Sequence, residues 1–262
     1  MISTVTPGDL NEMLCNGFMF ALIWHICNIC VVPRFFNTFV ASSYTKCSPQ
    51  QQNVWNIKMV TSVFSCLIVP LAFYCVYFDE AVRQDPIMGT SPWVRWTLQV
   101  ATGFFIWDLH ICVKYYADWG APFLLHALFC LATYVMLSSY GYMIRLGLSA
   151  LLYEVCVPFL NARWFVDAIF KIEQTSPPQR STKPVIWHIL NVVFVVLFIG
   201  VRICFGTFLT YNVVKTSFTL PTLPFWFRIV SSTNIILSYL LNWVWTRTIL
   251  RNIQKYSKTG LD

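Results

Sequence analysis

The sequence predicts an all-α, polytopic integral membrane protein that crosses the bilayer about seven times. Of its residues, 57% are hydrophobic and only 11% are charged, whereas soluble domains are about 25% charged. Apolar runs of about twenty residues, the length that a helix needs to cross the hydrocarbon core, recur along the chain with short polar interruptions. These observations predict a single helical membrane domain.

Each apolar run is predicted to form one span. The expected spans are 13–32, 59–78, 94–116, 121–138, 141–164, 185–213 and 223–246. A signal peptide begins with a positively charged segment, and no Lys or Arg precedes the first run. This run is therefore expected to be retained as a span. Only Ser139 and Tyr140 separate spans four and five, so a re-entrant hairpin is the alternative there.

Basic residues near the span ends predict the orientation. Most of them, including Arg34, Lys58, Arg163 and Arg251, fall on one side, which the positive-inside rule assigns to the cytosol. The C-terminus is therefore expected to be cytosolic and the N-terminus lumenal or exterior. The surplus of Lys and Arg on the predicted cytosolic side also accounts for the net charge of +7. No nucleic-acid partner is therefore expected.

The ten cysteines predict neither a disulfide framework nor a metal site. Most of them lie inside apolar runs, where cysteine behaves as a small buried hydrophobe. Cys27 and Cys30 have the spacing of a metal-binding pair, but no second pair follows at a zinc-binding interval. No metal is expected.

Ionisable groups at membrane depth are costly, and they are candidates for a functional site. Counted along the helices, Asp108, His126 and Glu154 lie at one depth in the cytosolic half. Arg202 is expected in the opposite half. We predict a catalytic group of Asp108, His126 and Glu154. The polar lining of a lipid pocket is predicted to comprise Asn161, Asn191, Asn242 and Arg202. The alternative is that these side chains only hold helices together.

Four segments carry a resemblance to a known family. They resemble elements of TLC-domain membrane proteins and occur in the order that is typical of that family: 48–58 (beginning SPQ), 103–108 (GFFIWD), 124–126 (LLH) and 154–164 (EVCVPFLNARW). The chain looks more similar to the small TLC-domain-containing proteins than to the ceramide synthases. The resemblance implies a six-helix barrel over 46–251, preceded by a region (1–45) with the first helix and followed by a cytosolic tail (252–262).

The resemblance implies a role in membrane lipid homeostasis, with membrane lipids as partners and the endoplasmic reticulum as location. Ceramide synthases of this fold use two adjacent histidines for acyl transfer from acyl-CoA. Here His126 matches the first histidine, but Ala127 stands at the second, and the His-Asp-x-x-Asp element is missing. Two hypotheses follow: acyl transfer with acyl-CoA as cosubstrate, or non-catalytic binding, sensing or transfer of a lipid. The sequence predicts no bound cofactor and no particular oligomeric state.

The orientation can be tested with inserted glycosylation acceptors. Sites placed in the 79–92 loop should be glycosylated because the positive-inside rule puts that loop in the lumen. Sites placed in the 167–183 segment should stay unmodified. Glycosylation of the second set alone would reverse the predicted orientation.

Overall fold

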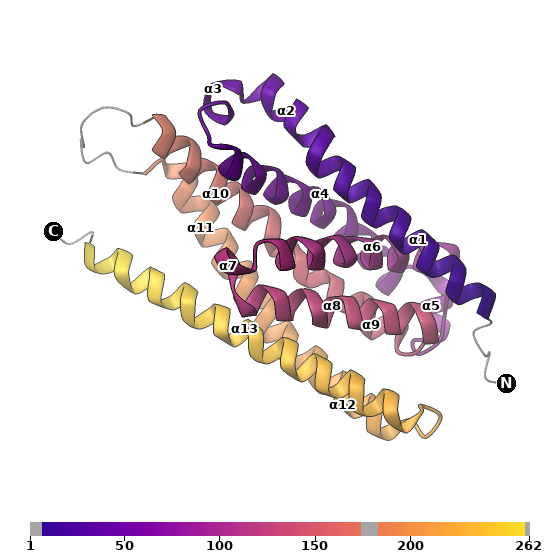
Figure 1. Ribbon diagram of the computed structural model, residues 1–262. Helices are drawn as coiled ribbons and strands as arrows, with labels where there is room; N and C mark the ends of the chain where they lie inside the picture. Colours follow the sequence, from indigo (N-terminus) through magenta and orange to yellow (C-terminus); the bar gives the residue numbers. More distant parts are fainter. Residues whose placement is uncertain (1–6, 174–182, 260–262) are drawn as a thin grey trace.

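The computed structural model describes residues 7–173 and 183–259, and within these ranges all regular structure is helical (Figure 1). The first half contains α1 (Pro7–Ile26), η1 (Cys27–Val31), α2 (Val32–Phe39), α3 (Ala41–Tyr44), α4 (Pro49–Tyr77), α5 (Glu80–Gln84), α6 (Pro92–Lys114), α7 (Tyr116–Trp119) and α8 (Ala121–Tyr140). The second half contains α9 (Ile144–Ala150), η2 (Leu151–Cys156), α10 (Val157–Glu173), α11 (Val185–Leu197), η3 (Phe198–Phe205), α12 (Gly206–Thr219) and α13 (Phe225–Thr259).

Successive elements join into seven long rods that match the seven predicted segments. Over the part of the chain that is described, five rods are long and apolar enough to cross a membrane: Cys15–Phe39, Pro49–Tyr77, Ala121–Tyr140, Ile144–Ile172 and Val185–Thr219. The other two, α6 and α13, have 23 and 35 residues, but tryptophans and ionisable residues make them more polar. The all-α, polytopic fold is confirmed, while the crossings by α6 and α13 stay predictions.

The boundary between the fourth and fifth predicted spans is a tight reversal. Gly141 follows α8 with a positive φ of 63°, and its amide donates to the Leu137 carbonyl at 2.9 Å. Glycine adopts this left-handed conformation without the steric penalty of a Cβ, so it commonly ends helices. The helices on both sides qualify as full spans, which favours two crossings over a re-entrant hairpin.

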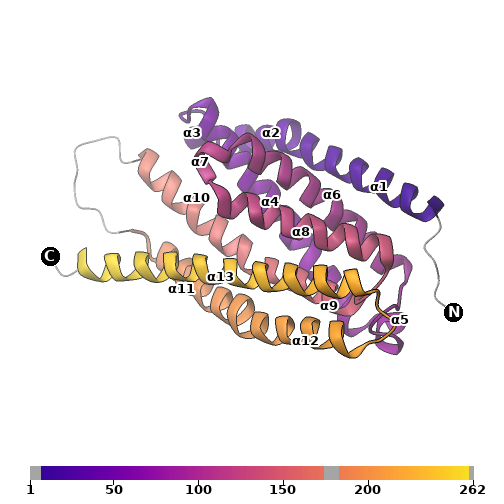
Figure 2. The ribbon, with the colours of Figure 1, turned by 60° about the horizontal axis from the view of Figure 1, so that its bottom comes forward.

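The six rods after α2 pack into a closed ring. α4 contacts α6, α6 contacts α8, α8 contacts α13, α13 contacts α12, α11 contacts α10, and α10 returns to α4. This is the arrangement that the resemblance implies. α1 packs outside the ring against α6, and α12 and α13 run side by side in Figures 1 and 2.

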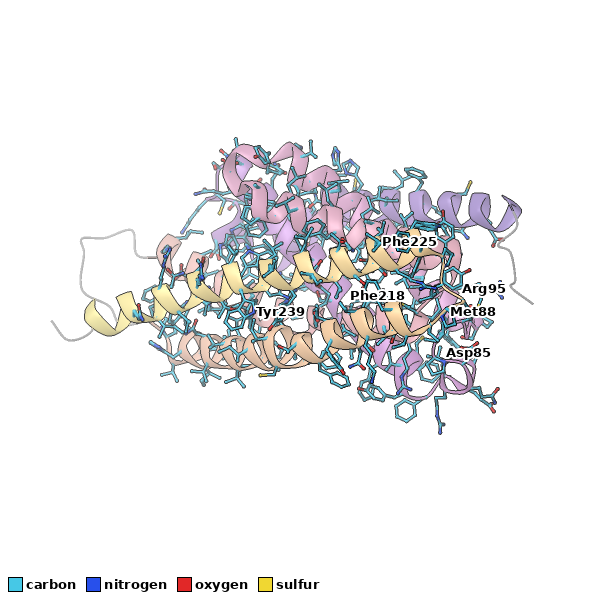
Figure 3. All side chains as sticks on the ribbon, turned by 90° about the horizontal axis from the view of Figure 1, so that it is seen from below. Asp85, Met88, Arg95, Phe218, Phe225 and Tyr239 are labelled. Atoms are coloured by element: carbon cyan, nitrogen blue, oxygen red, sulfur yellow. The ribbon has the colours of Figure 1, made fainter. Side chains whose placement is uncertain are left out.

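The connections alternate between the two ends of the bundle. The loop containing Asp85 and Met88 lies at the same end as Phe218 and Phe225, which flank the α12–α13 turn (Figure 3). Backbone hydrogen bonds from Ile144 to Ile87 and from Arg145 to Pro86, both 3.1 Å, bring the start of α9 to this end. The last turn of α10, the first turn of α11 and the last turns of α13 lie at the opposite end (Figure 1). The described loops and helix ends thus fall into two groups, while the assignment of either end to the cytosol stays a prediction.

Local sequence explains where α4 begins. Ser48 accepts a hydrogen bond from the Gln51 amide at 3.3 Å, while the Gln51 side chain accepts one from the Ser48 amide at 2.9 Å. This reciprocal capping box satisfies two amides that the first helical turn leaves without partners. Pro49 at the first helical position needs no amide partner.

Gly103 permits the close approach of α1 to α6. A Cβ on Gly103 would lie 2.4 Å from the Phe20 Cβ and 2.7 Å from the Gly17 carbonyl oxygen. The adjacent Phe104 ring stacks on Phe64 of α4 and meets the Trp24 ring of α1 edge-to-face. The glycine of the GFFIWD segment therefore has a packing role.

Gly103→Ala should lower the free energy of unfolding by about 1–3 kcal/mol, because α1 must move to accommodate the methyl group. Gly200→Ala is the matched control, since no side chain or distant backbone lies within 4 Å of its added Cβ. Its effect should stay within about 0.5 kcal/mol. Thermal unfolding in one detergent measures both, and equal losses would contradict the packing role.

Candidate polar site inside the helix ring

The candidate site lies where two rods depart from regular α-helix. Glu154 is on η2, a 3₁₀ stretch between α9 and α10, and Arg202 is on η3, a π-helical stretch between α11 and α12. Short stretches of these helix types inside longer helices often mark functional positions. Both departures bring an ionisable side chain to the interior of the ring.

Glu154 and Arg202 form an ion pair. The Arg202 Nη2 atom lies 3.2 Å from the Glu154 Oε1 atom, and only 6% and 10% of the two side chains are exposed. The Ser65 hydroxyl donates to the other carboxylate oxygen at 3.5 Å. Arg202 also donates to the Asn242 Oδ1 at 3.4 Å. The pair thus connects α4, η2, η3 and α13.

Aromatic rings enclose the Arg202 guanidinium. The guanidinium carbon lies 5.6 Å from the Trp245 ring centroid, 5.8 Å from Phe198 and 5.9 Å from Tyr153. Contacts of this kind stabilise a cation that has been removed from water. The Arg202 Nε atom is buried and has no hydrogen-bond partner within the described ranges. The Nε–H group is therefore an unused hydrogen-bond donor inside the site.

The prediction that Arg202 and Glu154 lie in opposite halves of the bilayer is wrong, because the two side chains form an ion pair. The predicted depth of Glu154 was counted from Arg163, near the expected end of the fifth span. In the structure α10 continues to Glu173. Glu154 therefore lies about 28 Å from that helix end, near the middle of the bilayer core. Arg202 is near the centre of the rod formed by α11, η3 and α12, so the two residues meet.

A cavity of about 60 Å³ adjoins the ion pair. It brings together four of the predicted site residues, His126, Glu154, Arg202 and Asn242. The other lining residues are Phe105, Cys130, Thr133, Tyr134, Ala150, Leu151, Tyr153, Ile235 and Ser238. The polar atoms of the cavity thus come mainly from α8, η2, η3 and α13.

His126 has an aromatic and a thiol neighbour. Its ring centroid lies 5.2 Å from that of Trp245 in an edge-to-face arrangement. The Cys130 Sγ atom is 3.7 Å from each ring nitrogen. Among the described side chains no carboxylate hydrogen-bonds to His126. The imidazole therefore lacks the acidic partner that the predicted catalytic group requires.

Asp108 is not among the residues that line this cavity. It is half-buried on α6, near enough to Glu154 for electrostatic repulsion. Within the described ranges it has no hydrogen bond or ion pair. Asp108 thus lies near Glu154 without contacting the cavity.

Asn161 and Asn191 lie away from the cavity and join helices. The Asn161 amide donates to the Lys58 carbonyl at 3.0 Å, to the Thr61 hydroxyl at 2.9 Å and to the Ser62 hydroxyl at 3.0 Å, which links α10 to α4. Asn191 accepts from Arg163 Nη1 at 2.8 Å, which links α11 to α10. These are the contacts expected from the helix-packing alternative.

A second, apolar cavity of about 60 Å³ adjoins the polar one. Both cavities are lined by Thr133, Ala150 and Ile235. The remaining lining of the second cavity is mostly aliphatic, aromatic or methionine: Met136, Leu137, Met143, Leu146, Gly147, Val213, Phe227, Ser231 and Asn234. The two cavities are therefore neighbours with a junction at these three residues, and only the first has ionisable side chains in its lining.

Sequence reasoning did not single out Ser65, Tyr153 or Trp245. Trp245 lies three residues after Asn242, so helical spacing places it on the same face, and Tyr153 precedes Glu154. Ser65 offers no such signal. Among the described residues, no group of three His, Cys, Asp or Glu side chains is placed to hold a metal ion.

The family model described as the TLC domain matches residues 54–251, which is most of the chain and nearly all of the helix ring. The chain belongs to the TLC-domain family. Ala127, at the second histidine position of the ceramide synthases, is fully buried and does not line the polar cavity.

Several proteins of this family are similar to the chain. TLC domain-containing protein 4 of Homo sapiens is 28% identical over 153 residues, covering 58% of this chain and 56% of that protein. An uncharacterized TLC domain-containing protein of Schizosaccharomyces pombe is 31% identical over 212 residues, covering 80% and 66%. Topoisomerase I damage affected protein 4 of Saccharomyces cerevisiae is 25% identical over 210 residues, covering 79% and 70%. The matches span little more than half the length of the vertebrate relatives.

Arg202→Met should destabilise the protein by about 3–5 kcal/mol, because the Glu154 carboxylate would remain buried without its partner. Adding Glu154→Gln should recover much of the loss, since the second change removes that charge. The free energies of unfolding of the wild type, the two single variants and the double variant together form a double-mutant cycle. A double variant as unstable as the sum of the single losses would show that the pair does not couple.

Proposed function

We propose that this TLC-domain protein binds a membrane lipid without transforming it. The head of the lipid lies beside the Glu154–Arg202 pair, and its chain enters the apolar cavity lined by Met136, Met143 and Phe227. The observation that carries the proposal is the junction at Thr133, Ala150 and Ile235. An amphiphile has the same sequence of polar and apolar parts as the two cavities.

The contacts of Glu154 and His126 favour binding over catalysis. A general base must lie within about 2.6–3.2 Å of the proton that it removes, and a group that orients it usually hydrogen-bonds to it. Glu154 is engaged by Arg202 and Ser65, while the neighbours of His126 are Trp245 and Cys130. Neither arrangement supplies an activated imidazole.

Acyl transfer from acyl-CoA to a lipid remains a second candidate, favoured by one observation. His126 and Glu154 line the same cavity, so one substrate bound there could contact both the imidazole and the carboxylate. In this candidate His126 acts as the base or the transient acyl acceptor. Acyl-CoA is then the cosubstrate.

Membrane lipid homeostasis is the proposed cellular role, in the endoplasmic reticulum membrane with the C-terminus in the cytosol. The role and the organelle are supported by the family, and the orientation by the distribution of Lys and Arg. A protein that retains one lipid class inside the bilayer changes the free amount of that class by mass action.

Ala150→Phe should abolish lipid retention, because the added ring fills the junction between the cavities without removing a polar group. Ala132→Phe is the matched control, since Ala132 is exposed on the outer face of α8. Mass spectrometry of lipid that remains after extensive detergent washing measures retention. Wild type and the control should retain the same lipid, and equal retention by Ala150→Phe would contradict the assigned cavity.

The same preparations distinguish binding from acyl transfer. Incubation with labelled acyl-CoA and the retained lipid should yield no acylated product from the wild type or from His126→Ala. Product that forms with the wild type and disappears with His126→Ala would replace the binding function with acyl transfer.

A further inference from the structure

A second polar cluster lies near the end of the bundle where α10 ends and α11 begins, apart from the cavities. Lys58 is on α4, and its ammonium lies 4.9 Å from the centroid of the Trp164 ring on α10. Arg163 is also on α10, and its guanidinium lies 5.7 Å from the Trp187 ring on α11. Three helices therefore bring two cations and two tryptophans together.

The two cations repel each other, and Lys58 has no acidic partner among the described residues. Lys58 and Arg163 are near enough for Coulomb repulsion, and within the described ranges no ion pair includes Lys58. The acidic residue on the adjacent turn of α10, Asp167, already pairs with Lys171 at 2.8 Å and with Lys183. The positive charge of Lys58 is thus not balanced by a described carboxylate.

Helix lengths place this cluster at the border between hydrocarbon and head groups. α4 has 29 residues and is about 44 Å long, which exceeds the core thickness of about 30 Å. The polar first residues of α4, 49–53 (PQQQN), indicate that the excess lies at this end. Lys58, nine residues after Pro49, then lies about 14 Å along the helix, at the depth where tryptophans gather in membrane proteins.

We propose that Lys58 and Arg163 bind the phosphate of an anionic phospholipid in this leaflet. Lys58 supplies ammonium donors, Arg163 supplies its guanidinium on the neighbouring helix, and Trp164 and Trp187 border the glycerol region. An anionic head group there removes the repulsion between the two cations. The site is separate from the Glu154–Arg202 cavity, so either proposal can fail without the other.

The test uses the full-length protein in nanodiscs of equal parts phosphatidylcholine and phosphatidylglycerol. After transfer to neutral detergent, the ratio of the two retained lipids is measured by mass spectrometry. Wild type should enrich phosphatidylglycerol over phosphatidylcholine, and Lys58→Met should reduce the enrichment about five-fold, the effect of one basic residue near an anionic membrane surface. Lys58→Arg keeps the charge and should preserve the enrichment.

Lys46→Met is the matched control, because Lys46 is exposed just before α4 and its loss changes the net charge equally. It should leave the enrichment unchanged. Equal losses in Lys46→Met and Lys58→Met, or no loss in Lys58→Met, would overturn the proposal.

Pyrophosphate added to the protein in pure phosphatidylcholine tests whether a soluble phosphate occupies the site instead of a lipid. Thermal stabilisation of wild type but not of Lys58→Met, without phosphatidylglycerol enrichment, would assign the site to a soluble phosphate and overturn the lipid assignment.

Discussion

The buried ion pair between Glu154 and Arg202 is the interaction on which the interior of the ring depends. Removing two charges from water costs several kcal/mol per ion, and the pair compensates this cost only when both partners are held in good geometry. Ser65 and Asn242 supply hydrogen bonds, and three aromatic rings surround the cation. Four elements are thereby tied to one point, and the polar cavity beside it has little net charge. That balance suits a neutral or zwitterionic head group better than an isolated anion.

Much of the fold could be predicted, because the bilayer imposes simple requirements on helix length and composition. Apolar runs located all seven rods, and Gly141 located the reversal between α8 and α9. The helix ends were less accessible. α10 continues to Glu173 and α4 begins at Pro49, since interfacial turns are polar and resemble loops in a hydropathy pattern. The same limitation led to the wrong prediction that Arg202 and Glu154 lie in opposite halves of the bilayer. The irregular stretches η2 and η3 had no sequence signal.

The candidate site was predicted in part. High desolvation cost drew attention to Glu154, Arg202, His126 and Asn242, and these four residues line one cavity. The same argument cannot say which polar groups pair with each other, and it selected Asn161 and Asn191, whose hydrogen bonds join helices instead. It also could not predict that Glu154 pairs with Arg202 and not with His126. Such a choice depends on the distance between side chains of different helices, which periodicity within one helix does not contain.

The capping box at Ser48 and Gln51 also shows that α4 begins before the segment that the family model matches. The family match begins at residue 54, five residues inside α4. A chain trimmed to that boundary would lose Ser48, Pro49 and Gln51, leaving the first turn of its helix uncapped. It would also lose α1 and expose to lipid the face of α6 around Gly103. Laboratory work on the isolated domain should therefore keep the residues from α1 onward.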